Sequence, residues 1–144
     1  MSTNSNGPVS VSMAHHIDPQ LKLIKELIEI PTVSRDSNLE LINFVSNYLE
    51  SHGIESQLIH SDCGNKANLV ATVGPNITGG IVLSGHTDVV PVDGQDWHSD
   101  PFCLNQREGR IYGRGTSDMK SFCAIALSLV PEMRALKRPI HLAL

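Results

Sequence analysis

A continuous apolar run at residues 81–84 (IVLS) limits the architectures open to this chain. The run stands between Gly79-Gly80 and Gly85, and a short apolar segment bounded by glycines is typical of a strand covered on both faces of a sheet. Segments with helical periodicity precede and follow it. Helices on both sides of buried strands indicate an α/β domain with three layers, αβα.

Three segments carry apolar residues at the spacings of a helix that packs on a core. The first begins at Asp18-Pro19, a good cap followed by a proline suited to the first helical position. It stops at Ile30-Pro31, because the residue before a proline avoids the helical region. The second covers about residues 37–51, and the third follows a capping hydroxyl at position 116 or 117. Their apolar positions are Leu21, Ile24, Leu27 and Ile28, then Leu41, Ile42, Val45 and Leu49, then Phe122, Ile125, Ala126, Leu129 and Met133.

Further strands are expected at residues 54–60 and 67–73, and a hairpin turn at Glu108-Gly109. The chain ends in an apolar segment, residues 139–144 (PIHLAL), which has the pattern of the beginning of a buried strand. We therefore expect a fragment that is truncated at its carboxyl end. Residues 1–17 are expected to form a flexible tail, and residues 18–144 the amino-terminal part of a larger domain.

The composition excludes several classes of protein. Lys and Arg number 11 and Asp and Glu 15, which gives a net charge of −4, and aromatic residues make up 4%. This argues against nucleic-acid binding and against a polybasic membrane surface. No apolar stretch approaches the roughly 20 residues of a membrane span, and residues 1–16 lack the apolar core of a secretory signal. Three cysteines without paired spacing are typical of reduced thiols, so we expect a cytoplasmic protein.

The first residues that carry chemistry directly follow the apolar run. His86 and Asp88 lie beyond the end of that strand, where α/β sheets place ligands, and residues two apart in an extended chain point to the same side. A neutral imidazole can bind a metal while a carboxylate holds its other ring nitrogen. The alternative is a core histidine that a neighbouring group satisfies, and this pattern alone leaves both open.

The second such segment is residues 113–120 (GRGTSDMK). Its glycines permit a tight loop before the third helix, which predicts that Asp118 lies in the first helical turn. The helix dipole keeps a carboxylate ionised there, and an ionised carboxylate can bridge two cations. The alternative is an acidic residue that merely suits a first turn.

Other known patterns do not fit this sequence. Asp118 stands where the dinucleotide fingerprint needs its third glycine, and Val82 breaks the nucleophile elbow pattern around Ser84. A phospho-accepting Asp88 requires an upstream acidic pair that residues 54–74 lack. Among the other histidines, His98 could approach the site from its polar loop, whereas His141 alternates with apolar residues.

Residues 79–102 (GGIVLSGHTDVVPVDGQDWHSDPF) and 109–121 (GRIYGRGTSDMKS) together resemble the cocatalytic zinc aminoacylase and metallopeptidase family. The similarity runs from about Ile24 to the last residue. It implies that residues 18–144 are the first part of a three-layer αβα, zinc-peptidase-like catalytic domain. It also implies a homodimer, formed through an inserted domain that is absent from this chain.

The resemblance assigns roles by position. His86 and Asp118 are the implied metal ligands, with Asp118 bridging two zinc ions, and Asp88 is the implied catalytic residue that orients His86. The general base and the other ligands fall beyond Leu144 in the family pattern. The implied cofactor is a pair of zinc ions, for which cobalt can substitute. Because two ligands cannot hold two zinc ions tightly, these 144 residues alone are expected to be inactive.

The motifs and the resemblance leave three candidate functions open. The leading one is hydrolysis of the amide of a small N-acyl amino acid, with N2-acetyl-L-ornithine, and thus arginine biosynthesis, as the first candidate. The second is the same chemistry on succinyl-diaminopimelate, another acyl amino acid or a dipeptide. The third is a non-enzymatic α/β interaction or regulatory domain without metal. Neither a nucleic acid nor a membrane is an expected partner.

Overall fold

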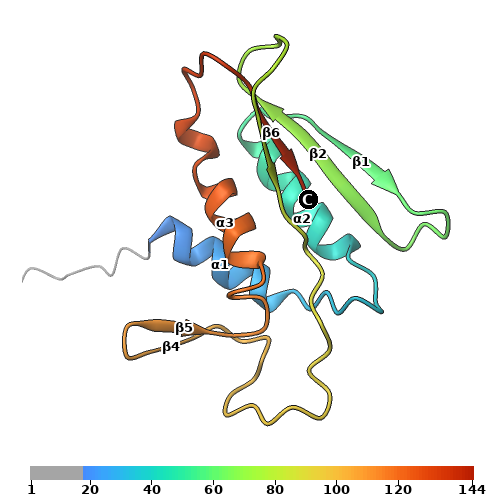
Figure 1. The fold of residues 1–144 in the computed structure, drawn as a ribbon, viewed down its shortest axis with the longest axis vertical. Coiled ribbons are helices and arrows are strands. Elements are labelled where there is room, and N and C mark those ends of the chain that lie inside the picture. Colours follow the sequence, from blue (N-terminus) through green and yellow to red (C-terminus); the bar gives the residue numbers. More distant parts are fainter. Residues whose placement is uncertain (1–17) are drawn as a thin grey trace, which may run out of the picture.

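The computed structural model describes residues 18–144, which form a mixed sheet, a layer of helices and a small hairpin (Figure 1). The predicted flexible tail, residues 1–17, lies outside the described residues. The helices are α1 (Pro19–Glu29), α2 (Leu39–Ser51) and α3 (Lys120–Ser128), and a 3-10 turn, η1 (Val130–Glu132), follows α3. The main sheet contains β1 (Ser56–His60), β2 (Ala67–Val73), β3 (Ile81–Ser84) and β6 (Ile140–Ala143); the hairpin contains β4 (Asn105–Arg107) and β5 (Arg110–Tyr112).

The main sheet has the strand order β1-β2-β6-β3. β2 runs antiparallel to β1 and to β6, whereas β3 runs parallel to β6. β6 therefore lies inside the sheet, with Leu142 paired to Ala71 on one side and to Leu83 on the other. The α/β fold class predicted from the sequence is confirmed, as is the strand expected within residues 139–144.

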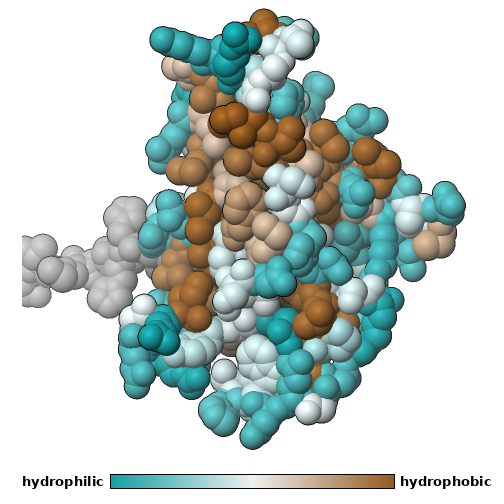
Figure 2. Space-filling view, in the orientation of Figure 1, coloured by the Kyte–Doolittle hydropathy of each residue, from teal (hydrophilic) through white to brown (hydrophobic). Residues whose placement is uncertain are grey.

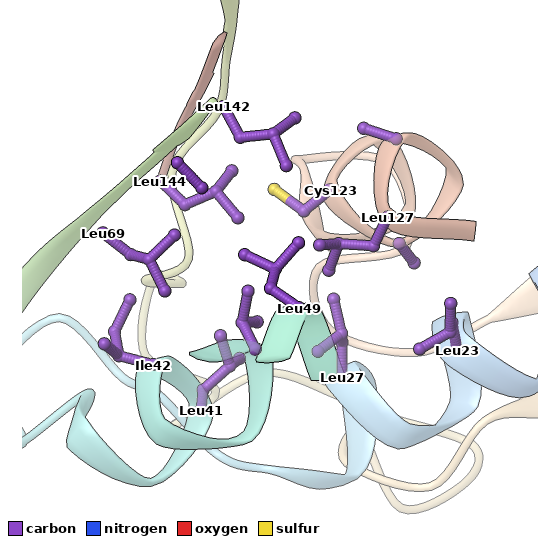
Figure 3. Packing of buried hydrophobic residues seen from close by; sticks show 14 of the residues in the cluster. Leu23, Leu27, Leu41, Ile42, Leu49, Leu69, Cys123, Leu127, Leu142 and Leu144 are labelled. Atoms are coloured by element: carbon purple, nitrogen blue, oxygen red, sulfur yellow. The ribbon is translucent and has the colours of Figure 1, made fainter. Parts of the chain in front are cut away.

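The core lies between one face of this sheet and the helices (Figure 3). α2 packs on β1 and β2, and α1 packs against α3. Side chains of a strand point alternately to its two faces, and β2 buries every second residue, namely Ala67, Leu69, Ala71 and Val73. Leu142 and Leu144 extend this buried face from the last strand toward Cys123 of α3 (Figure 3). The sheet and the helices thus share a single apolar core.

The expectation that β3 is covered on both faces is wrong for the described residues. Ile81 and Val82 are 64% and 59% exposed. The physical reason is position: β3 is an edge strand that pairs with β6 alone in the described part of the chain. Of the predicted three layers, residues 18–144 supply the sheet and one helical layer, and the opposite sheet face leaves Ile59 and Val70 exposed.

The termini of α1 follow the sequence signals, whereas the start of α3 does not. The Asp18 carboxylate accepts a hydrogen bond from the Gln20 backbone N–H at 3.0 Å, and α1 ends before Ile30-Pro31. α3 begins only at Lys120, because the Thr116 hydroxyl donates back to the Gly113 carbonyl at 2.9 Å instead of capping a helix. Asp118 therefore lies in the loop before α3, and its predicted place in the first helical turn is wrong.

Candidate metal centre

The end of β3 is pressed against α3, which fixes where the candidate ligands begin. A Cβ atom added to Gly85 would lie 2.9 Å from the Cys123 sulfur and 3.1 Å from a ring carbon of Phe122. Only glycine lets the backbone pass so close to the helix. The Cys123 thiol also contacts the His86 carbonyl, with 3.7 Å between sulfur and oxygen. The segment that follows Gly85 is thereby placed beside the amino-terminal end of α3.

The structure brings the three predicted site residues together. The distance from His86 Nε2 to Asp118 Oδ1 is 2.8 Å, although the two residues are far apart in the sequence. The other ring nitrogen, His86 Nδ1, lies 3.2 Å from Asp88 Oδ1 and 3.0 Å from the Asp88 carbonyl oxygen. Thr87, between them, is buried at 4% exposure, so His86 and Asp88 share the outward side of the segment as the spacing predicts.

The electrostatics of this cluster favour a cation at the ring. Partial burial by itself lowers the pKa of His86, but the hydrogen bond to Asp118, the contact with the Asp88 backbone and the two carboxylate charges outweigh it. The net result is a pKa raised above the ordinary value of a histidine. A proton on Nε2 is the simplest cation that the pair can share, and a divalent metal between the same two atoms is another.

The donor atoms suit zinc, which binds imidazole nitrogen and carboxylate oxygen. The Asp118 side chain is 83% exposed and the His86 side chain 47%, so both can be reached from solvent. Within residues 18–144, no group of three or more His, Cys, Asp or Glu residues is arranged to hold a metal ion. The two donors therefore fit one side of a metal centre, and the described residues do not complete it.

A buried lysine anchors the loop that carries Asp118 to a neighbouring helix. Lys120 is fully buried, and its Nζ donates hydrogen bonds to the carbonyl oxygens of Leu27 at 2.9 Å and Ile30 at 2.7 Å. Burial lowers the pKa of Lys120 to about 8. Gly115, at φ +93°, packs against this side chain, and its carbonyl accepts the Lys120 backbone N–H at 2.8 Å. Lys120 thus ties the Asp118 loop to the end of α1.

The remaining histidines considered in the sequence lie elsewhere. His98 is exposed in the loop between β3 and β4 and is not among the groups bonded to the His86 ring in residues 18–144. His141 bonds to Thr72 across the strand pair, with 2.9 Å between Nδ1 and the hydroxyl oxygen. Sequence reasoning missed Thr32 and Asn38, whose side chains reach the 86–88 segment from far along the chain.

A mixed sheet with a histidine held between two carboxylates beyond one strand end defines an α/β protein with a candidate metal site. The sequence model of peptidase family M20/M25/M40 matches residues 82–144. Acetylornithine deacetylase of Proteus mirabilis is 42% identical over 121 residues, which are 78% of this chain and 31% of that protein. The enzyme of that name from Photorhabdus laumondii is 38% identical over 136 residues, 88% and 35% of the two chains. Over residues 82–144 this chain is therefore similar to peptidase family M20/M25/M40.

Solved structures support the same grouping. An M20 family metallo-carboxypeptidase from Sulfolobus solfataricus superposes with a TM-score of 0.73 at 25% identity, over 88% of this chain and 30% of that one. Human carnosine dipeptidase 1 gives a TM-score of 0.70 at 22% identity, over 86% and 31%, which shows the fold. The chain spans about a third of the length of the curated relatives it matches. In the described residues, no helix is both long and apolar enough to cross a membrane.

Proposed function

We propose that this chain is the amino-terminal part of a metal-dependent amidohydrolase that converts N2-acetyl-L-ornithine to L-ornithine and acetate. The observation that carries the proposal is the 2.8 Å approach of His86 Nε2 to Asp118 Oδ1, together with identities of 34–42% to acetylornithine deacetylases. Residues 18–144 then form the first part of the catalytic domain. Cytoplasmic location and a role in arginine biosynthesis follow from the same proposal.

The proposed roles of the site residues follow from their contacts. His86 would present Nε2 as one ligand, and Asp118, whose carboxylate has two oxygens, would serve as the ligand shared between two zinc ions. Asp88 holds the other ring nitrogen of His86 and so fixes the tautomer and the orientation of the imidazole. Bound zinc supplies a Lewis acid for the amide carbonyl and lowers the pKa of water, and cobalt can take its place.

The proposal leaves the other ligands and the general base to regions of the relatives that this chain does not span. A histidine and one bridging carboxylate give fewer donors than the three protein ligands of an ordinary catalytic zinc. We therefore propose that residues 1–144 alone do not turn over substrate. The homodimer is likewise proposed to form through a region outside this chain.

A chimera tests this function directly. Residues 1–144 are joined to the part of the Proteus mirabilis acetylornithine deacetylase that follows the matched segment, and hydrolysis of N2-acetylornithine is measured with zinc or cobalt. We expect turnover by the chimera, none by residues 1–144, and a loss of more than about 100-fold in chimeras that carry His86→Ala or Asp118→Asn. Turnover by the short chain, or full activity of the His86→Ala chimera, contradicts the proposal.

The same chimera separates the other candidate functions. A panel of N-acetyl, N-succinyl and dipeptide substrates is compared by kcat/KM. A preference for succinyl-diaminopimelate or for a dipeptide replaces the proposed substrate but keeps the reaction class. A folded chimera that contains no metal in zinc-replete medium favours a non-enzymatic α/β domain instead.

A further inference from the structure

A threonine from a distant part of the chain forms a hydrogen bond with the segment that carries His86 and Asp88, on the buried side of that segment. Thr32 is 1% exposed, and its hydroxyl donates a hydrogen bond of 2.5 Å to the carbonyl oxygen of Thr87. The two residues are 55 positions apart in the sequence. This carbonyl belongs to the peptide that links Thr87 to Asp88, so the hydrogen bond acts on the backbone between the two outward-facing site residues.

The backbone around Thr32 continues the same attachment. The Val89 N–H donates to the Thr32 carbonyl at 2.9 Å, and the Ser34 N–H donates to the Val89 carbonyl at 2.9 Å. Val33 and Val89 thereby form a short parallel bridge. The bridge fixes the chain after Asp88, whereas the Thr32 hydroxyl is the group that fixes the peptide before it.

Asn38 supports the buried side of the segment. Its amide exchanges two hydrogen bonds with the Ala67 backbone, at 2.8 Å and 3.0 Å, and its nitrogen lies 3.5 Å from the Thr87 hydroxyl. The Thr87 carbonyl therefore accepts a hydrogen bond from Thr32, and the Asn38 amide lies beside the Thr87 hydroxyl. Because Thr87 points inward, rotation of its peptide would turn Asp88 and the imidazole that Asp88 holds.

We propose that Thr32 is a positioning residue whose hydroxyl sets the Thr87–Asp88 peptide and, through it, the orientation of Asp88 and of the His86 ring. The geometric part stands on the contacts of this chain alone, and its consequence for metal binding rests on the function proposed above. Replacing the hydroxyl by a methyl group leaves the buried Thr87 carbonyl without its donor, and the peptide is then free to turn toward another partner.

Three variants of the 144-residue chain separate positioning from simple stability. Thr32→Val keeps the shape of the side chain and removes the donor, whereas Thr32→Ser keeps the donor and removes a methyl group. Val33→Ala shortens a neighbouring side chain that is 6% exposed and leaves the hydroxyl in place. Urea unfolding measures the stability of all three, so that effects on the site can be compared with effects on the fold.

The decisive readout is the ¹⁵N NMR spectrum of the histidine rings without metal, with His86 assigned by the His86→Gln variant. We expect the His86 ring signals to move in Thr32→Val and to stay near their original positions in Thr32→Ser and Val33→Ala. Unmoved signals in Thr32→Val, or an equal movement in Val33→Ala, overturn the inference.

A titration with Co²⁺ alone then tests the link to the proposed function. Thr32→Val is expected to weaken Co²⁺ binding by about tenfold, and Thr32→Ser to restore it. If the unmodified chain and its chimera bind no Co²⁺ while the ring signals still follow the hydroxyl, the proposed metal function fails and the positioning role of Thr32 stands.

Discussion

At the scale of single residues, the site depends on two carboxylates that do different work. Asp88 contacts the inner ring nitrogen of His86 and lies on the same short segment, whereas Asp118 approaches the outer nitrogen from another loop and is mostly exposed. The proposed role of the first is to orient the ring, and that of the second is to share a metal ion with it. This difference can be separated by substitution.

Asp118→Asn is expected to lower the affinity of the chain for Zn²⁺ or Co²⁺ by tenfold or more and to leave the free energy of unfolding nearly unchanged. The reason is that the side chain is 83% exposed and makes little contact with the core. Isothermal titration and urea unfolding give the two quantities. Asp96→Asn, in the exposed loop between β3 and β4, is the control; an equal loss of affinity there would point to general electrostatics instead of ligation.

Cys63 offers a second test at this scale, outside the site. The hydrogen bond between the Ser61 hydroxyl and the exposed Cys63 thiol, with 3.4 Å between oxygen and sulfur, is the main cause that lowers the pKa of Cys63, and the Asn65 backbone adds to it. Because the thiolate is the form that is alkylated, Ser61→Ala should shift the midpoint of the pH–rate profile of Cys63 alkylation upward. Peptide mass spectrometry resolves the sites, and the exposed Cys103 is the internal control; an unchanged midpoint contradicts the stated cause.

At the scale of helices and strands, Lys120 joins two elements that the sequence leaves unconnected. Its ammonium group satisfies carbonyl oxygens at the end of α1 while its backbone begins α3. These carbonyls have no helical partner of their own, since the last turn of a helix leaves its C=O groups free. A cation is a favourable group at that end, which offsets part of the cost of burying it.

Lys120→Ala is therefore expected to reduce the free energy of unfolding by about 3 kcal/mol, because it leaves a cavity and two unpaired carbonyls. Equilibrium unfolding in urea measures this change. Lys22→Ala on the outer side of α1, where the side chain is 67% exposed, should change stability by less than about 0.5 kcal/mol. Equal effects of the two substitutions contradict the anchoring role.

Element boundaries were predictable where the signal is local. Asp18-Pro19 and Ile30-Pro31 mark the two ends of α1 because a cap and a proline act on their own neighbours. The local signals predict a start of α3 that is too early, since the Thr116 hydroxyl donates to the Gly113 carbonyl and no local pattern reveals this hydrogen bond. The apolar pattern of β3 likewise does not reveal its exposure, because the place of β3 at a sheet edge depends on pairing with β6, far along the chain.

The candidate site likewise contains residues that the sequence predicts and residues that it does not. His86, Asp88 and Asp118 were predictable because each lies in a short motif whose spacing carries chemistry. Thr32 and Asn38 were not, because their hydrogen bonds cross 55 and 49 positions of sequence to reach Thr87 and leave no periodic trace. The roles of the three predicted residues in metal binding stay predictions that the variants above can test.

At the scale of the whole molecule, several large apolar side chains of residues 18–144 lie exposed at the surface. Figure 2 shows hydrophobic residues gathered over α3 and the adjoining part of the sheet. Among them Phe122 and Ile125 of α3, Leu129 directly after α3, and Ile81 and Val82 of β3 are each more than a third exposed. An exposed edge strand with apolar side chains is a template for association with other chains.

We expect the isolated 144-residue chain to self-associate in a concentration-dependent way and Val82→Lys to reduce this association. A lysine on an edge strand opposes pairing with a second edge. Light scattering and sedimentation velocity measure the effect. Asn68→Lys adds the same charge at an already exposed position of β2 and should change association less; an equal decrease in both variants would assign the effect to net charge alone.

The insertion of β6 between β2 and β3 dictates an order of assembly during synthesis. β1 and β2 can pair as soon as both have left the ribosome, because they are antiparallel neighbours in the sequence. β3 emerges next but finds its hydrogen-bonding partner only when residues 140–143 appear. Until then the nascent chain carries an unpaired apolar strand, the kind of segment that chaperones bind. The candidate ligands that follow β3 are thus expected to reach their final positions only after β6 has paired with β3.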